Sequence, residues 1–114
     1  MNNVRNVSLK YLFKKSDIIS IHIHLNKKTE NYINRKNLSL MKKNAILINT
    51  SRGKIINEKD LEQFLKTNKY FQAGLDVIDG EWLTAKKLSK HKLIKHSRNN
   101  NNLLIVPHIG GSTE

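Results

Sequence analysis

Four short apolar runs, separated by polar and helix-like stretches, most constrain what this chain can fold into. The runs are rich in Ile, Leu and Val and span residues 18–25, 45–50, 73–78 and 103–106. Apolar residues occupy both alternating positions at the start of the first run, which favours a strand buried in a parallel sheet. Helices are expected over residues 34–43 and after Asn57, which can act as an N-cap. The order is therefore β-α-β-α-β, then an irregular basic segment and a last strand, and it predicts an α/β sheet of parallel strands.

Side chains that can do chemistry follow each of the last three predicted strands. They include Arg52, Glu81 and His108, with Asp79 as the alternative carboxylate. Because the carboxyl ends of parallel strands meet at one edge of the sheet, where ligands bind, we expect these groups to converge there. A histidine exchanges protons near neutral pH, a carboxylate beside it raises its pKa, and an arginine can clamp a substrate carboxylate. Such a set suits removal of a proton from a hydroxyl group next to a carboxylate.

The composition excludes several classes of protein. The 114 residues contain no cysteine, so disulfides, thiolate metal sites and a cysteine nucleophile are excluded. No run of about 18 apolar residues is present to span a membrane. The start of the chain lacks the apolar segment of a secretion signal. A cytoplasmic protein without a membrane partner is therefore expected.

The net charge of +12, from 21 basic and 9 acidic residues, is high enough to consider a polyanion such as nucleic acid as a partner. The basic residues are mostly lysines spread among many Asn and Ile, which indicates a bias of the whole sequence rather than a nucleic-acid site. The densest basic stretch, residues 86–98, contains no acid. A solvated loop or helix is the favoured interpretation of this stretch. A non-catalytic remnant or basic binding module that uses it is the alternative to an enzyme.

His22 and His24 lie two apart in the first predicted strand and would then point to the same face. With His91, His96 or His108 as a third ligand, they could in principle hold a metal ion. No acidic or cysteine ligand lies at suitable spacing, so we expect no metal site.

Four sequence blocks carry a resemblance to a known family. They are residues 16–22 (SDIISIH), 48–53 (INTSRG), 73–77 (AGLDV) and 107–113 (PHIGGST). In this order they resemble the second half of the NAD-binding domain of the D-isomer-specific 2-hydroxyacid dehydrogenases, the family of phosphoglycerate, glycerate and D-lactate dehydrogenases. The resemblance covers essentially the whole chain. It implies part of a Rossmann-like, doubly wound sheet, with about four parallel strands and their crossover helices. It also implies NAD-linked interconversion of a D-2-hydroxy acid and its 2-keto acid.

The resemblance implies roles for individual residues. Arg52 would bind the carboxylate and keto group of the substrate, His108 would be the acid/base, and Glu81 would pair with that histidine. Asp76 would contact the nicotinamide amide, and Arg52 and His108 would also lie against the cofactor. The other cofactor-binding positions would be Thr50, Ser51, Gly110 and Gly111 on the nicotinamide side, and His22 and Leu25 on the adenosine side.

The chain also departs from the family. Trp82 and His24 stand where the family usually has proline, and neither the Gly-rich phosphate loop GxGxxG nor the substrate-binding domain is present. The resemblance therefore implies a partial NAD-binding domain over residues 1–114. Weak NAD binding and no activity by itself are expected, because a glycine-rich turn at a helix N-terminus supplies much of the affinity for a dinucleotide. NAD is the expected cofactor, NADP stays open, and the whole family member would form a homodimer.

Overall fold

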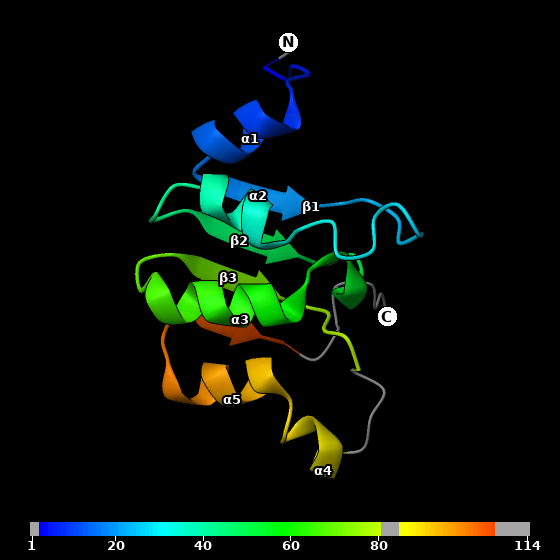
Figure 1. Ribbon diagram of the computed structural model, residues 1–114, viewed down its shortest axis with the longest axis vertical. Coiled ribbons are helices and arrows are strands. Elements are labelled where there is room, and N and C mark those ends of the chain that lie inside the picture. The colour runs from blue at the N-terminus through cyan, green and yellow to red at the C-terminus, as the bar shows by residue number, and fades with distance from the viewer. Residues whose placement is uncertain (1–2, 81–84, 107–114) are drawn as a thin grey trace.

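Four parallel strands form one sheet, in the order in which they occur along the chain (Figure 1). The computed structural model describes residues 3–80 and 85–106. Pairing joins Ile21 to Asn49, Asn49 to Leu75 and Leu75 to Ile105, so the four strands end at the same level. The predicted α/β sheet of about four parallel strands is confirmed. The strands are β1 (Ile18–Ile21), β2 (Ile46–Asn49), β3 (Gln72–Leu75) and β4 (Leu103–Ile105).

Helices accompany the strands along the described part of the chain. They are α1 (Leu9–Lys15), α2 (Arg35–Leu40), the single 3₁₀ turn η1 (Gly53–Ile55), α3 (Glu58–Thr67), α4 (Ala85–Leu88) and α5 (Lys92–Asn99). Successive helices touch: α1 contacts α2, α2 contacts α3, and α3 contacts α5. Figure 1 shows α2, α3 and α5 in a row across one face of the sheet. No helix within residues 3–80 and 85–106 is long and apolar enough to cross a membrane.

The core lies between this row of helices and one face of the sheet. It contains Ile19, Leu47, Ala73 and Leu103 from the strands, and Phe13, Leu38, Leu61 and Leu93 from the helices. The alternate strand residues face the other side, where the side chains of Ile18 and Leu104 are 59% and 66% exposed. The expectation that the first strand is buried on both faces is therefore wrong. Its physical reason is visible in Figure 1, where the helices pack against a single face.

The first strand is also shorter than predicted. It ends at Ile21 rather than at residue 25, because β2 ends at the paired Asn49 and offers no further ladder partner. The Ser51 hydroxyl instead donates a hydrogen bond to the carbonyl oxygen of Ile23. Residues 22–25 are thus irregular, so the prediction that His22 and His24 share one face of a strand is wrong.

The sequence prediction did not place three helices, α1, α4 and α5. Ser8 accepts a hydrogen bond from the Tyr11 amide at the start of α1. At the start of α5, Nδ1 of His91 accepts from the Leu93 amide at 3.1 Å, although histidine is not among the preferred N-caps. Of the two interpretations of the basic stretch, solvated loop or helix, the structure shows mostly helix. By contrast, the predicted cap is confirmed: Oδ1 of Asn57 accepts from the Asp60 amide at 3.1 Å.

A buried polar link joins α5, α3 and the residue before β4. Nε2 of His96 bonds to Oδ1 of Asn102 at 2.8 Å, and Nδ2 of Asn102 donates to the Leu65 carbonyl at 3.0 Å. Both polar side chains are buried. Because Asn102 supplies the accepting oxygen, the His96 ring carries its proton on Nε2. The link fixes α5 and the start of β4 to the end of α3.

Candidate functional site

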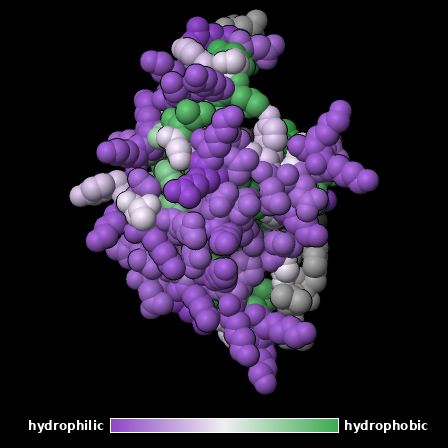
Figure 2. Space-filling view, viewed as in Figure 1, coloured by the Kyte–Doolittle hydropathy of each residue, from purple (hydrophilic) through white to green (hydrophobic). Residues whose placement is uncertain are grey.

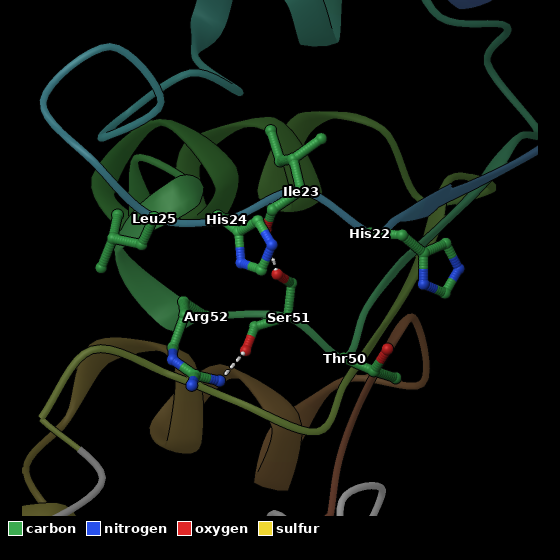
Figure 3. Close-up of a pocket in the computed structure, with 7 residues that line it drawn as sticks. All are labelled: His22, Ile23, His24, Leu25, Thr50, Ser51 and Arg52. Atoms are coloured by element: carbon green, nitrogen blue, oxygen red, sulfur yellow. Dashed lines mark hydrogen bonds between the residues drawn. The ribbon is translucent and has the colours of Figure 1, made fainter.

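A cleft of about 520 Å³ opens at the carboxyl ends of β1 and β2, the edge at which a parallel sheet binds ligands (Figure 3). Two irregular segments that follow these strands form its walls. Ile23 and Leu25 provide partly exposed apolar surface, and the polar side chains come mainly from the second segment. The lining residues are His22, Ile23, His24, Leu25, Thr50, Ser51 and Arg52.

The turn that carries Thr50, Ser51 and Arg52 is shaped by Asn49, the last residue of β2. The Asn49 side chain is fully buried. Its Oδ1 accepts from the Ser51 amide at 2.9 Å, and its Nδ2 donates to the Arg52 carbonyl at 2.9 Å. One side chain therefore satisfies both a donor and an acceptor of the turn. Asn49 had no predicted role, although its place directly before three predicted site residues is a signal in the sequence.

Hydrogen bonds connect the two walls of the cleft and orient one of its histidines. The Ser51 hydroxyl donates to the Ile23 carbonyl, so the two strand-end segments are tied across the cleft (Figure 3). Nε2 of His22 lies 2.8 Å from the hydroxyl oxygen of Ser20. Five of the expected cofactor-binding residues lie around this one opening: His22, Leu25, Thr50, Ser51 and Arg52.

Arg52 is exposed at the rim of this cleft. Its Nη1 donates to the Ser51 carbonyl at 2.8 Å, which folds the side chain back along the turn (Figure 3). A guanidinium group has five N–H donors, and this bond uses one of them. Its other donors leave a planar cation at the cleft. Such a group recognises a carboxylate through two hydrogen bonds.

Asp76 follows β3 at the level of Thr50. Its amide donates to the Asn49 carbonyl at 3.0 Å, which continues the ladder by one residue, and the residue is buried. The structure thus brings Asp76 to the edge that carries the cleft, next to the turn that carries Arg52. The other predicted site residues, Glu81, His108, Gly110 and Gly111, lie outside the described residues, as does Trp82.

A carboxylate–imidazole pair lies beside the loop that follows β3. Nε2 of His91 is 3.0 Å from Oε1 of Glu58, and both side chains are largely buried. The hydrogen bond to Glu58 raises the pKa of His91 above its ordinary value, although burial acts against this, and the Asp79 carbonyl adds to the rise. Asp79 itself, the alternative carboxylate, is exposed. From the sequence, His91 was considered only as a metal ligand, and its pairing with Glu58 was not predicted.

The basic stretch of residues 86–98 belongs to different elements from the cleft. Its lysines and Arg98 are exposed on α4, α5 and the turn between them, whereas Leu93 and His96 of α5 face the core. Figure 2 shows that the helical face of the molecule is predominantly hydrophilic. Within the described part of the chain, no three His, Asp or Glu side chains cluster in a way that could hold a metal ion.

Comparison with protein families identifies the class to which this fold and cleft belong. Residues 1–110 match the family described as D-isomer specific 2-hydroxyacid dehydrogenase, NAD binding domain. The chain belongs to this family, as the four sequence blocks predicted. Its members are NAD-dependent oxidoreductases, and the sheet is the Rossmann-like sheet of their NAD-binding domain.

Individual relatives have the same chemistry in their names. The chain is 42% identical over 107 residues to the glyoxylate reductase of Thermococcus litoralis, covering 94% of this chain and 30% of that protein. It superposes with a TM-score of 0.84 on the NAD-complexed D-isomer specific 2-hydroxyacid dehydrogenase of Lactobacillus delbrueckii ssp. bulgaricus, at 33% sequence identity, and the match covers 95% of this chain and 34% of that one. The Aquifex aeolicus D-lactate dehydrogenase complexed with NAD and lactic acid matches with a TM-score of 0.81 and 36% identity. This match covers 95% of the present chain and 34% of the Aquifex chain. The chain therefore spans about a third of the length of these relatives.

Proposed function

We propose that this chain carries the catalytic groups of an NAD-linked dehydrogenase that interconverts a D-2-hydroxy acid and its 2-keto acid. The observation that carries the proposal is Arg52, an exposed cation on a turn fixed by a buried asparagine, at a cleft on the sheet edge where α/β proteins bind ligands. Relatives that reduce glyoxylate or bind lactic acid point to small 2-hydroxy and 2-keto acids as substrates.

The residues of the cleft suit NAD. The apolar side chains of Ile23 and Leu25 offer a wall for a ring on the adenosine side, and Thr50, Ser51 and Asp76 are polar groups at the same sheet edge for the nicotinamide side. When bound, the nicotinamide takes up a hydride in oxidation and releases it in reduction. NAD is the proposed cofactor, and the missing ribose-binding segment would decide between NAD and NADP.

In the proposed reaction, Arg52 holds the substrate carboxylate and orients the carbon that exchanges the hydride. During oxidation His108 takes the proton of the hydroxyl group, while the carbon that carries this group gives up its hydride to the nicotinamide. During reduction His108 returns the proton to the keto oxygen. Glu81 pairs with His108 and stabilises its charged form. These roles for Glu81 and His108 rest on the family resemblance and complete the set to which Arg52 belongs.

We further propose that NADH binding and turnover need the parts of the family's dehydrogenases that this chain does not match. It lacks the GxGxxG loop, so NADH should bind weakly to the chain alone and turnover should be absent. A homodimer of the whole protein is part of the same proposal, and it rests on the resemblance.

The test uses a grafted enzyme, in which this chain replaces the matching region of the Thermococcus litoralis glyoxylate reductase. Steady-state reduction of glyoxylate with NADH is compared for the grafted enzyme and its Arg52→Ala variant. Charge-assisted hydrogen bonds contribute about 1.5–3 kcal/mol each, so kcat/KM should fall by roughly 10²-fold or more. Arg35→Ala, which removes an exposed arginine from α2, is the matched control and should change little. A folded Arg52→Ala variant with unchanged kcat/KM would contradict the proposal.

A further inference from the structure

The loop that follows β3 is pressed directly onto the residue that follows Arg52. A Cβ atom added to Gly53 would lie 2.2 Å from the carbonyl carbon of Ile78 and 2.4 Å from the amide nitrogen of Asp79. Both are backbone atoms, so no side chain can be accommodated without moving the loop. Glycine is therefore required at position 53 for this close approach. The contact joins the segment that carries Arg52 to the loop that leads into Glu81.

The same loop is held from its other side by Glu58 and His91. Oε2 of Glu58 accepts from the Asp79 amide at 2.7 Å, and Oε1 of Glu58 lies 3.0 Å from Nε2 of His91. Nε2 of His91 also lies 2.9 Å from the Asp79 carbonyl. The peptide groups on both sides of Asp79 are thus bound by one carboxylate–imidazole pair, in which the two side chains are 17% and 13% exposed.

Each member of the pair is itself fixed by a helix start. Glu58 is the first residue of α3, directly after the Asn57 cap. In its neutral form His91 caps α5, because its Nδ1 accepts from the Leu93 amide and its Nε2 proton then lies between Glu58 and Asp79. Two packed helices therefore set the position of Asp79 in this loop. The residue after Asp79 is Gly80, which has a φ of 87°. This left-handed conformation favours glycine and turns the chain immediately before Glu81.

We infer that Glu58 and His91 are positioning residues, which hold residues 78–80 against Gly53 and so fix the turn that carries Arg52. The inference rests on the proposed function, in which Arg52 binds the substrate carboxylate. Arg52 directly precedes Gly53, so a shift of this contact moves the arginine relative to the cleft. A displacement of about 1 Å can lower a rate by about 10²-fold.

The first test measures kinetics in the grafted enzyme with Glu58→Ala, and with Glu62→Ala as the matched control. Glu62 lies on the same helix and is similarly shielded, but it pairs with Lys66 at 3.4 Å rather than with the loop. We expect Glu58→Ala to lower kcat by about ten- to a hundredfold while KM for NADH stays unchanged. His91→Ala should behave alike, and His91→Gln, which keeps a donor near the Nε2 position, should recover most of the rate.

The KM for the substrate separates positioning from general loss of structure. In the proposed reaction Arg52 binds the substrate carboxylate, so a displaced turn weakens this contact. Glu58→Ala should therefore raise KM for glyoxylate, whereas Glu62→Ala should leave it unchanged. A loss of rate in proportion to the unfolded fraction, with KM for glyoxylate unchanged, would show a merely structural role and overturn the inference.

The second test uses the chain itself and needs no activity. Hydrogen exchange of the Asp79 amide should speed up at least tenfold in Glu58→Ala, with exchange of the Leu47 and Ala73 amides in the core strands unchanged. Unchanged protection of the Asp79 amide would overturn the inference, because Glu58 and His91 would then not hold the loop. The outcomes also separate the two proposals. If Arg52→Ala abolishes turnover but Glu58→Ala alters neither kcat nor KM for glyoxylate, the positioning role fails and the proposed function stands.

Discussion

At the scale of single residues, the cleft depends on side chains whose task is to bind backbone. Asn49 shows this most clearly, since it is fully buried and holds both the Ser51 amide and the Arg52 carbonyl. A buried donor or acceptor that loses its partner keeps the full cost of its desolvation. Asn49 therefore links the stability of the fold to the placement of the proposed carboxylate clamp.

Asn49→Ala should lower the free energy of unfolding by about 1–3 kcal/mol, because the turn loses two hydrogen bonds at once. Urea denaturation of the chain measures this directly. Asn44→Ala, at an exposed position in the turn before β2, is the matched control and should change stability by no more than about 0.5 kcal/mol. Equal effects of the two substitutions would mean that the Asn49 bonds contribute nothing.

The pH dependence of stability should carry a contribution from His91. Its pKa is raised in the folded chain, so the folded state binds this proton more tightly than the unfolded state does. The charged groups that face the ring are Glu58 of α3 and Asp79 of the loop after β3. The contribution is complete below about pH 6.5 and is lost as the pH rises through the raised pKa.

The difference in free energy of unfolding between wild type and His91→Gln should therefore shrink as the pH rises from about 6 to about 9. Urea denaturation across this range measures it, and Glu58→Gln should remove the same dependence because it removes the carboxylate that favours the imidazolium. A difference that grows with pH would contradict the assigned direction.

Among the helices and strands, hydrophobic patterning allowed the strands to be predicted from the sequence. Features that depend on hydrogen bonds of single polar side chains could not be predicted in this way. All four strands occur within a few residues of their predicted bounds, because runs of Ile and Leu report burial directly. The bounds of α5 could not be predicted, because His91 supplies its cap. In the site, Arg52 and Thr50 could be named from their sequence block, but Glu58 could not, since its partners are 21 and 33 residues away along the chain.

The buried link between α3, α5 and β4 should be essential to this arrangement. Asn102→Ala removes the acceptor of His96 and the donor to the Leu65 carbonyl, so we expect a loss of about 1–3 kcal/mol in the free energy of unfolding. Asn101→Ala changes the exposed neighbour and is the matched control. Thermal unfolding of both variants decides the matter, and an Asn102→Ala variant as stable as Asn101→Ala would show that the link is not stabilising.

At the scale of the whole molecule, the sheet has one covered face and one open face. Parallel sheets are normally covered on both faces, yet Ile18 and Leu104 are more than half exposed on the side away from the helices. The chain spans about a third of the length of its relatives. The open face supports the proposal that further segments complete the domain, and with it the dinucleotide site.

In the proposed reaction His108 supplies the proton that accompanies hydride transfer at the cleft. Single-turnover oxidation of NADH by glyoxylate in the grafted enzyme, with and without His108→Ala, tests this role. The rate should fall by about 10²–10⁴-fold, as for loss of a general acid, while affinity for NADH is retained. A folded His108→Ala variant that binds NADH and transfers hydride at the original rate would contradict it.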